Sequence, residues 1–258
     1  MKNDNLRRSG DDERDGAVEG RNSVIEALRA GRKIDKLFVQ KEQDQTLKFI
    51  VAKARESGAA VVEVDRKKLD TMSTTRSHQG IIATMPARDY ADLDAVIAAA
   101  KNGERPPLFV VCDGITDPSN LGAIIRSAET AGADAVIVQK RRSAGLTATV
   151  SKASAGALEH MQVARVPNIT ALLRDLKDEG FWIFGADGSG EKTIYEADFT
   201  VPTVIVVGSE GEGISRLVLE QCDWVLSIPM FGKVTSLNAG SAAAVILFEA
   251  VRQRISKK

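Results

Sequence analysis

Apolar and polar positions divide the chain into short segments of two kinds. Runs of mostly apolar residues predict buried β-strands, and segments whose apolar residues recur every three or four positions predict helices. Up to residue 86 this pattern predicts strands at 36–39, 60–64 and 80–84 and helices at 24–30, 47–56 and 66–72. The folded part of the chain therefore begins with a small α/β domain of about 70 residues.

Beyond residue 107, strands and helices alternate regularly. The predicted strands are almost continuously apolar, and they lie at 108–112, 135–138, 162–166, 182–185 and 203–207. The predicted helices lie at 121–131, 149–158, 170–178 and 238–254. This alternation predicts a parallel sheet with helices on both faces, in which ligands bind at the carboxyl ends of the strands.

A stretch rich in turn residues separates the two parts. After a predicted helix at 93–100, residues 102–107 read Asn-Gly-Glu-Arg-Pro-Pro, which is typical of a linker because Gly and Pro interrupt helices and strands. The first 16 residues are charged and offer little to bury, so we expect a flexible tail. The predicted organisation is a tail at 1–16, a first domain at 17–88, a linker at 89–107 and a second domain at 108–258.

The composition excludes several classes of protein. The chain has 258 residues, of which 43% are hydrophobic, and no apolar run approaches the roughly 18 residues of a membrane helix, so neither disorder nor membrane spanning is expected for the body. The start of the chain lacks an apolar stretch, so no secretion signal is predicted. Cys112 and Cys222 have no second Cys or His at ligand spacing, which argues against a disulfide framework or a zinc site. We expect both to be buried in a reducing, cytoplasmic compartment.

The net charge is zero, but the charges are unevenly distributed. Residues 17–88 carry 14 basic and 9 acidic side chains, whereas residues 89–258 carry 17 basic and 21 acidic ones. A positive first domain is typical of a module that binds phosphates. On charge alone, an ordinary solvated surface explains the excess equally well.

Three loops that follow strands carry candidate chemistry. The first, 113–126, holds Asn120 near a helix start and Arg126 on the helix. Asn120 as an N-cap and Arg126 as a surface charge are the structural alternatives. The second loop, 208–215, is rich in glycine and holds Glu210. It lacks the third glycine of a dinucleotide-binding fingerprint, so we expect its glycines to let the backbone approach a ligand.

The third loop, 228–238, contains Pro229 and Gly232, which exclude a regular strand or helix. It ends at Ser236 and Asn238, and either of these could simply cap the last helix. Elsewhere the signals are weaker: His78 and His160 are isolated, no metal-ligand cluster or Walker A sequence is present, and the basic residues 140–142 are more typical of a solvated loop.

Taken together, the three loops resemble the SpoU (TrmH-like) RNA ribose 2′-O-methyltransferases. The motifs Asp-Pro-Ser-Asn-Leu-Gly-Ala…Arg-Ser-Ala, Gly-Ser-Glu-Gly-Glu-Gly-Ile and Ile-Pro-Met…Ser-Leu-Asn follow the order and spacing of that family. Residues 19–24 and 78–81 look like the N-terminal RNA-binding module of the RlmB-type members, which methylate a guanosine of 23S rRNA. One departure is Ala239-Gly240, where the family usually continues with Val-Ser; this affects the expected packing of the last helix.

The resemblance implies a fold, a cofactor and partners. The second domain would be a SPOUT α/β-knot, a parallel sheet with a trefoil knot, which is a rare exception to unknotted topology. The first would be a small α/β RNA-binding domain of the L30e/L7Ae-like kind. The resemblance also implies a homodimer that receives an Arg from the partner subunit, no metal, and S-adenosylmethionine bound by the backbone of Gly208, Ile228 and Leu237.

The resemblance further implies that Arg126, Asn120, Glu210, Ser236 and Asn238 carry the chemistry. The ribose 2′-oxygen attacks the sulfonium methyl in line, so the protein must position the reactants and handle one proton. Because an arginine stays protonated, we expect Arg126 to hold the adjacent phosphate and stabilise the developing alkoxide. The proton would be removed by a phosphate oxygen or by transient deprotonation. Asn120 and Glu210 would orient Arg126, and Ser236 and Asn238 would bind the target nucleotide.

Three alternatives stay open. Within the family, the substrate could be tRNA, although relatives with an extra N-terminal module favour rRNA. An RNA- or ribosome-binding relative without catalysis should lose part of the polar set, which is complete here. A nucleotide-dependent dehydrogenase would need the missing glycine and would have no use for a basic first domain.

Overall fold

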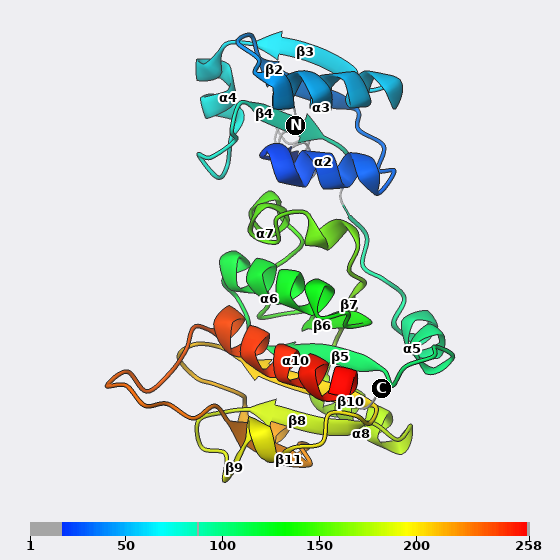
Figure 1. Ribbon diagram of the computed structural model, residues 1–258, viewed down its shortest axis with the longest axis vertical. Coiled ribbons are helices and arrows are strands. Elements are labelled where there is room, and N and C mark those ends of the chain that lie inside the picture. Colours follow the sequence, from blue (N-terminus) through cyan, green and yellow to red (C-terminus); the bar gives the residue numbers. More distant parts are fainter. Residues whose placement is uncertain (1–16, 87, 257–258) are drawn as a thin grey trace, which may run out of the picture. The chain divides into compact units, whose positions relative to one another are not determined.

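The computed structural model describes residues 17–86 and 88–256, so the tail predicted at 1–16 lies outside the described residues. Two compact units form (Figure 1). The first runs to Asp89 and also includes Gly145–His160, and the second comprises Tyr90–Ala144 and the residues from Met161 onward. In the described part of the chain, no helix is both long enough and apolar enough to cross a membrane.

The first unit is built on a four-stranded sheet with the order β1-β4-β2-β3, in which only β2 and β3 run parallel. Its strands are β1 (Ala17–Glu19), β2 (Lys36–Gln40), β3 (Ala60–Val64) and β4 (Ile81–Thr84). Its first three helices are α2 (Arg21–Arg29), α3 (Gln45–Glu56) and α4 (Arg66–Met72). Alternate residues of each strand face opposite sides of a sheet. Leu37 and Val39 accordingly join the core formed with α2 and α3, while Phe38 packs with Leu69 of α4.

The segment Gly145–His160 completes this unit. It forms α7 (Ala148–Ala153) and the 3₁₀ turn η1 (Ala157–Glu159), so the single helix predicted at 149–158 is wrong. The helix stops because Ala155 and Gly156 take left-handed φ values of 51° and 95°. Gly156 cannot carry a side chain here, since a Cβ would lie 2.5 Å from the side chain of Glu26.

The second unit contains a seven-stranded sheet whose neighbouring strands all run parallel, in the order β7-β6-β5-β10-β8-β11-β9. The parallel sheet predicted from the sequence is confirmed. Its strands are β5 (Leu108–Asp113), β6 (Ala135–Gln139), β7 (Val163–Val166), β8 (Trp182–Ala186), β9 (Lys192–Thr193), β10 (Thr203–Gly208) and β11 (Trp224–Ser227). The knot that the family resemblance implies stays a prediction.

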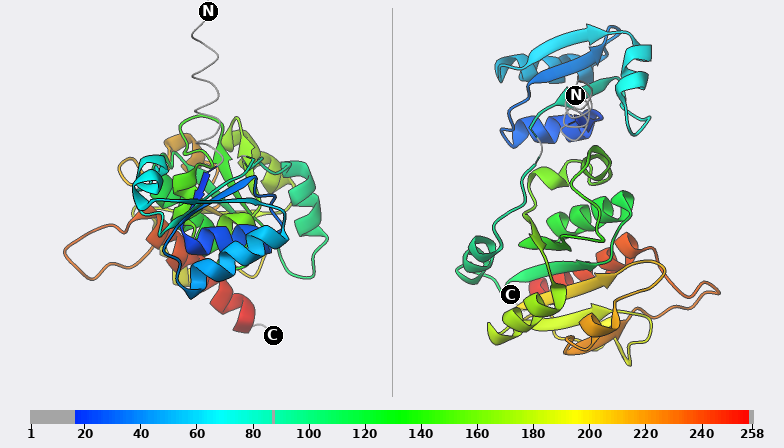
Figure 2. Two further views of the ribbon diagram at one scale, coloured as in Figure 1. Left: turned by 90° about the horizontal axis from the view of Figure 1, so that it is seen from above. Right: turned by 180° about the vertical axis from the view of Figure 1, so that it is seen from behind.

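Helices cover both faces of this sheet. One face packs against α5 (Leu93–Lys101), α8 (Ile169–Asp178) and α9 (Arg216–Leu219), which share one apolar core with the strands. On the other face, α6 (Pro118–Thr130) lies beside α10 (Ala239–Ser256), as the views from opposite sides show (Figures 1 and 2). A 3₁₀ turn, η2 (Ile194–Glu196), completes the unit. The strands β5 and β10 are neighbours, but the helices that follow them, α6 and α9, pack on opposite faces of the sheet. The carboxyl ends of these two strands therefore form the crevice where such sheets bind ligands.

Small residues let the last helix pack closely against α6. Gly240 lies against α6, where a Cβ would come 2.7 Å from Cβ of Ala123, so glycine at the position of the family departure permits close contact between the two helices. The opposite side of α10 is not covered in the described structure. There Val245, Phe248 and Ile255 are 38%, 49% and 66% exposed.

Candidate active site

The three loops singled out in the sequence converge at the carboxyl edge of the second sheet. Gly208, the last residue of β10, lies opposite Asp113, the last residue of β5. Asp113 is buried, and its Oδ2 accepts a hydrogen bond from the backbone nitrogen of Ser215 at 2.7 Å. The glycine-rich loop is thereby tied to the strand that leads into α6.

Asn120, Glu210 and Asn238, one from each loop, form a hydrogen-bonded network. The Nδ2 of Asn120 donates to Oε1 of Glu210 at 3.0 Å, and the Nδ2 of Asn238 donates to Oδ1 of Asn120 at 2.7 Å. Asn238 also donates to the same Glu210 oxygen, which in addition accepts from the backbone nitrogen of Ala239 at 3.4 Å. Three donors therefore converge on one oxygen of the Glu210 side chain.

The structure shows that Asn120 is not a helix cap, whereas Asn238 both caps a helix and belongs to the network. Asp117, not Asn120, caps α6: its side chain accepts from the backbone nitrogen of Ser119, and the hydrogen bonds from Ser119 lower the pKa of Asp117. Asn120 therefore lies inside the first helical turn with its side chain buried. Asn238 does cap α10, because its Oδ1 accepts from the backbone nitrogen of Ser241 at 3.2 Å, while its amide nitrogen belongs to the network.

Arg126 lies on an exposed part of α6. In the described part of the chain, its guanidinium has no hydrogen bond or ion pair. Among the described residues, neither Asn120 nor Glu210 hydrogen-bonds to the Arg126 guanidinium, and their side chains bond to each other and to Asn238. Their role in orienting Arg126 stays a prediction. Arg126 is thus free to contact a bound molecule. Ser236 is also exposed on the third loop.

A cavity of about 340 Å³ opens beside this network, and Gly208, Ile228 and Leu237 all line it. This volume falls in the range of small-molecule sites. The second and third loops supply most of the wall, together with the turn after β8. The lining has three carboxylates and no Lys or Arg; it consists of Ala186, Asp187, Gly188, Val207, Gly208, Ser209, Glu210, Gly211, Glu212, Gly213, Leu226, Ile228, Met230, Thr235, Ser236, Leu237, Ala239 and Ala242.

We expected glycine at position 208 to let the backbone approach a ligand, but the structure shows that packing within the loop requires it. A Cβ there would lie 2.1 Å from the backbone carbon of Gly213, because the loop folds back on the strand. Two backbone hydrogen bonds between Ser209 and Gly213, of 3.1 and 3.0 Å, close this loop. Gly208 thus lets the chain pack against itself, and Gly211 has open space around it.

The weaker candidates stay outside this site. The basic residues 140–142 are exposed on the loop after β6, with Arg142 at a left-handed φ of 58°. Cys112 and Cys222 are free thiols; burial is the main cause that raises the pKa of each to about 12, so neither is a reactive thiolate. Among residues 17–86 and 88–256, no group of three or more His, Cys, Asp or Glu could hold a metal ion.

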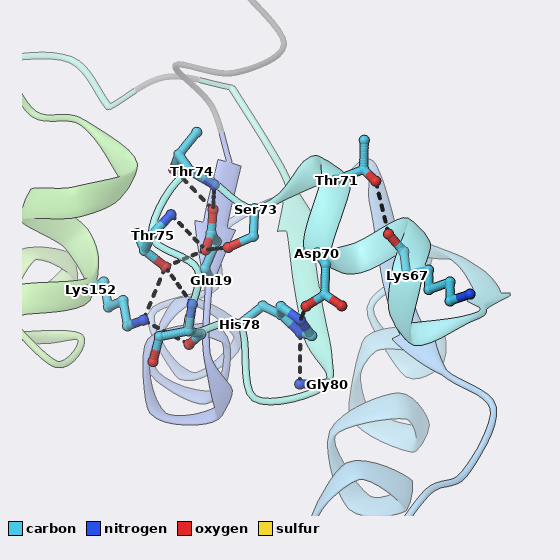
Figure 3. Close-up of polar contacts among 11 residues, drawn as sticks. Glu19, Lys67, Asp70, Thr71, Ser73, Thr74, Thr75, His78, Gly80 and Lys152 are labelled. Atoms are coloured by element: carbon cyan, nitrogen blue, oxygen red, sulfur yellow. Dashed lines mark hydrogen bonds and ion pairs between the residues drawn. The ribbon is translucent and has the colours of Figure 1, made fainter.

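The first unit contains a polar cluster that the sequence reasoning missed (Figure 3). Glu19 is fully buried at the end of β1, and it accepts hydrogen bonds from the residues that follow α4. Lys152 of α7 donates to Thr75, which Glu19 also binds, and to the backbone oxygen of Ser77. His78 is also buried: its Nδ1 accepts from the backbone nitrogen of Gly80, and its Nε2 lies 3.0 Å from Asp70. The signals in the sequence were a glutamate directly after Ala17 and Val18 and the family-like motifs at 19–24 and 78–81.

Comparison with known proteins defines the family. Residues 107–248 match the model of the SpoU rRNA Methylase family, and residues 17–91 match the model described as RNA 2′-O ribose methyltransferase substrate binding. YacO of Bacillus subtilis, assigned to the TrmH family of tRNA/rRNA methyltransferases, is 43% identical over 241 residues, which are 92% of this chain and 95% of YacO.

Two solved structures share the fold. The crystal structure of an RNA 2′-O ribose methyltransferase has a TM-score of 0.81 at 28% identity and covers 96% of this chain and 92% of that one. The AdoMet-bound rRNA methyltransferase from Sinorhizobium meliloti has a TM-score of 0.77 at 26% identity and covers 95% and 90%.

The chain belongs to the SpoU family of RNA ribose 2′-O-methyltransferases and carries the family's substrate-binding domain at its N-terminal end. The family, the α/β fold and S-adenosylmethionine as the family's cofactor, all predicted from the sequence, are confirmed.

Proposed function

We propose that this chain methylates the ribose 2′-hydroxyl of a guanosine in 23S rRNA. The observation that carries the proposal is the network of Asn120, Glu210 and Asn238, which joins three loops beside the 340 Å³ cavity. A protein that only binds RNA has no need to hold these three side chains together. Within the fold, this network is what defines a preorganised reaction site.

The chemistry of the cavity lining supports S-adenosylmethionine as the ligand. Its lining includes the carboxylates Asp187, Glu210 and Glu212 without any basic side chain, which favours a cationic ligand over one that carries a pyrophosphate. The dehydrogenase alternative is disfavoured for this reason. When bound, S-adenosylmethionine supplies a methyl group activated by the sulfonium charge. We infer that Gly208, Ile228 and Leu237 hold it.

Arg126 is proposed as the group that acts on the RNA. Its guanidinium is exposed and without a protein partner among the described residues, so it is available to a phosphate. There it holds the phosphate next to the target ribose and stabilises the charge that develops on the 2′-oxygen, while a phosphate oxygen accepts the proton. Ser236 and Asn238 contact the target nucleotide, and the network fixes the loops that carry them.

We favour rRNA over tRNA because the chain has a whole unit given to substrate binding in addition to the methyltransferase fold. The rRNA methyltransferase from Sinorhizobium meliloti is matched along both units. Such a substrate would place the protein in the cytoplasm.

A second copy of the chain is proposed to cover the exposed side of α10. Val245, Phe248 and Ile255 follow helical spacing and form one apolar stripe, which water-exposed helices rarely keep. A homodimer through this face would bury the stripe.

The test is to map 2′-O-methylated nucleotides in rRNA and tRNA from a strain that lacks the gene. We expect one guanosine of 23S rRNA to lose its methyl group and to regain it when the wild-type gene is restored. A loss confined to tRNA would overturn the rRNA assignment. Unchanged methylation in both RNAs would remove the proposed reaction.

A further inference from the structure

The loop between α4 and β4, residues 73–79, has an unusually constrained backbone for an exposed segment. Two of its non-glycine residues, Arg76 and Gln79, take a left-handed φ of 54°. Bulky residues adopt this region only when the surrounding structure holds them there. We call residues 73–79 the braced loop.

Its first half is held by Glu19. The carboxylate accepts from Ser73 Oγ at 2.6 Å, from the backbone nitrogen of Thr74 at 2.7 Å and from the hydroxyls of Thr74 and Thr75. Burial alone would raise the pKa of Glu19, but the hydrogen bonds from Ser73, Thr75 and Thr74 outweigh it and lower that pKa. A buried carboxylate so completely paired fixes the loop that pairs with it (Figure 3).

Its second half is held from two other elements. Lys152 of α7 donates to Thr75 Oγ1 at 3.0 Å and to the carbonyl oxygen of Ser77 at 2.7 Å. Gln79 is bound to Arg21 of α2, whose backbone nitrogen and Nε donate to Oε1 and to the backbone oxygen of Gln79. Thr75 and Ser77, the residues that Lys152 binds, directly flank Arg76 in the loop.

The braced loop exposes the guanidinium of Arg76. Arg76 is exposed, and within the described residues its side chain has no hydrogen bond or ion pair. Arg66, Lys67 and Lys68 are exposed on α4, the helix that leads directly into the loop. Residues 17–88, which include this loop, carry 14 basic and 9 acidic side chains. A rigid loop that displays an arginine without a partner among the described residues suits a phosphate group.

We propose that the braced loop is a preorganised contact for the RNA backbone, with Arg76 as the group that binds phosphate and with Glu19 and Lys152 as positioning residues. The proposal rests on the proposed function, because it concerns how the same RNA is held. Lys152 belongs to the part of the chain that matches the methylase model, whereas the loop belongs to the substrate-binding match. The contact is therefore built jointly from the two matched regions.

The test compares variants for binding to purified 23S rRNA over a series of salt concentrations. Arg76→Gly removes the guanidinium and suits the left-handed backbone, so the loop keeps its shape. We expect it to weaken binding about tenfold and to reduce the slope of log K against log salt by about one, the effect of one lost phosphate contact. Arg55→Ala is the control, since Arg55 is likewise exposed on α3 in this unit.

Lys152→Met tests positioning. We expect it to weaken RNA binding in the wild-type background and to have no further effect in the Arg76→Gly background, because a positioning residue acts only through the group it positions. Additive effects would show that Lys152 does not act through Arg76. Affinity for S-adenosylmethionine should stay unchanged in every variant.

The outcomes separate this proposal from the proposed function. Arg76→Gly that binds 23S rRNA like the wild type, with the same salt slope, would overturn the proposal while leaving methyl transfer intact. The same would follow if Arg76→Gly impaired only methylation of ribosomal particles and not of free RNA, which would indicate a protein partner. A wild-type protein that binds 23S rRNA but never methylates it would instead contradict the proposed function.

Discussion

The side-chain amide of Asn238 donates to Oδ1 of Asn120 at 2.7 Å, although the two residues are 118 positions apart in the chain. This bond fixes the orientation of both amides, because Asn120 must then turn its nitrogen toward Glu210. The third loop is thereby fastened to the first turn of α6. The site exists only when both segments are in place, so a change at Asn238 should act on the whole site.

Asn238→Asp should separate the two roles of this residue. Aspartate still caps α10, but it cannot donate to Asn120 and it places a second negative charge beside Glu210. We expect a nearly unchanged melting temperature and a loss of methyl transfer of about 10²-fold. Asn168→Asp is the matched control, since Asn168 caps α8 in the same way and lies outside the network. Full activity of Asn238→Asp would show that the network is not needed.

Gly208→Ala should damage cofactor binding through the backbone. The added Cβ would lie 2.1 Å from the Gly213 carbon, so the loop that lines the cavity must move. We expect weaker binding of S-adenosylmethionine in calorimetry and a lower melting temperature. Gly211→Ala, in the same loop but with open space around it, should bind normally. Equal affinities in the two variants would contradict the assigned packing.

Glu19→Gln should lower the stability of the first unit in a pH-dependent way. The pKa of Glu19 is lowered in the folded state from an ordinary value of 4.5, so its carboxylate stabilises the fold above that pH, and the contribution is lost as the pH falls through the folded pKa. We expect the variant to be about 1.5–3 kcal/mol less stable at pH 7, the range for hydrogen bonds to a charged group. Urea unfolding below pH 4.5 should show the difference shrinking; a difference independent of pH would contradict this reasoning.

Glu159→Ala should show that the segment around α7 stabilises the first unit. The buried Glu159 carboxylate pairs with Arg32 at 3.0 Å and with Arg88 at 3.2 Å. Removing it leaves two partly buried guanidiniums without this partner, which should cost about 3 kcal/mol in urea unfolding. Glu179→Ala, which breaks an exposed pair with Lys101, should cost less than about 1 kcal/mol. Equal costs would mean that the segment contributes no more than a surface pair.

Much of this organisation could be predicted from the sequence because its signals are local or periodic. The strands of the second sheet are continuous apolar runs, and 60–64 and 66–72 match the observed elements residue for residue. Short elements escaped detection: β1, β9, β11 and α9 have two to four residues, too few to show a period. The break after α7 was missed because the left-handed Ala155 carries no signal in its residue type.

The candidate site could likewise be predicted only in part from the sequence. The resemblance of the three loops to the SpoU family selected Asn120, Glu210 and Asn238, and these side chains do meet. It could not show how their hydrogen bonds are shared, since this depends on three loops that are distant in sequence. Two further features also depend on the tertiary structure: within the described residues the Arg126 guanidinium has no hydrogen bond or ion pair, and Gly208 packs against its own loop. The association of residues 145–160 with the first unit has no sequence signal either.

Arg126→Ala decides whether the proposed site carries out the reaction. Single-turnover methyl transfer to 23S rRNA, with saturating S-adenosylmethionine, compares it with the wild type. We expect unchanged folding and cofactor affinity and a rate reduced by about 10²-fold or more, the scale for a lost charge-stabilising group. Arg126→Lys should not restore the rate, because a point charge cannot reproduce the two-pronged geometry of a guanidinium. An Arg126→Ala protein that methylates 23S rRNA at the wild-type rate would contradict both the site and its mechanism.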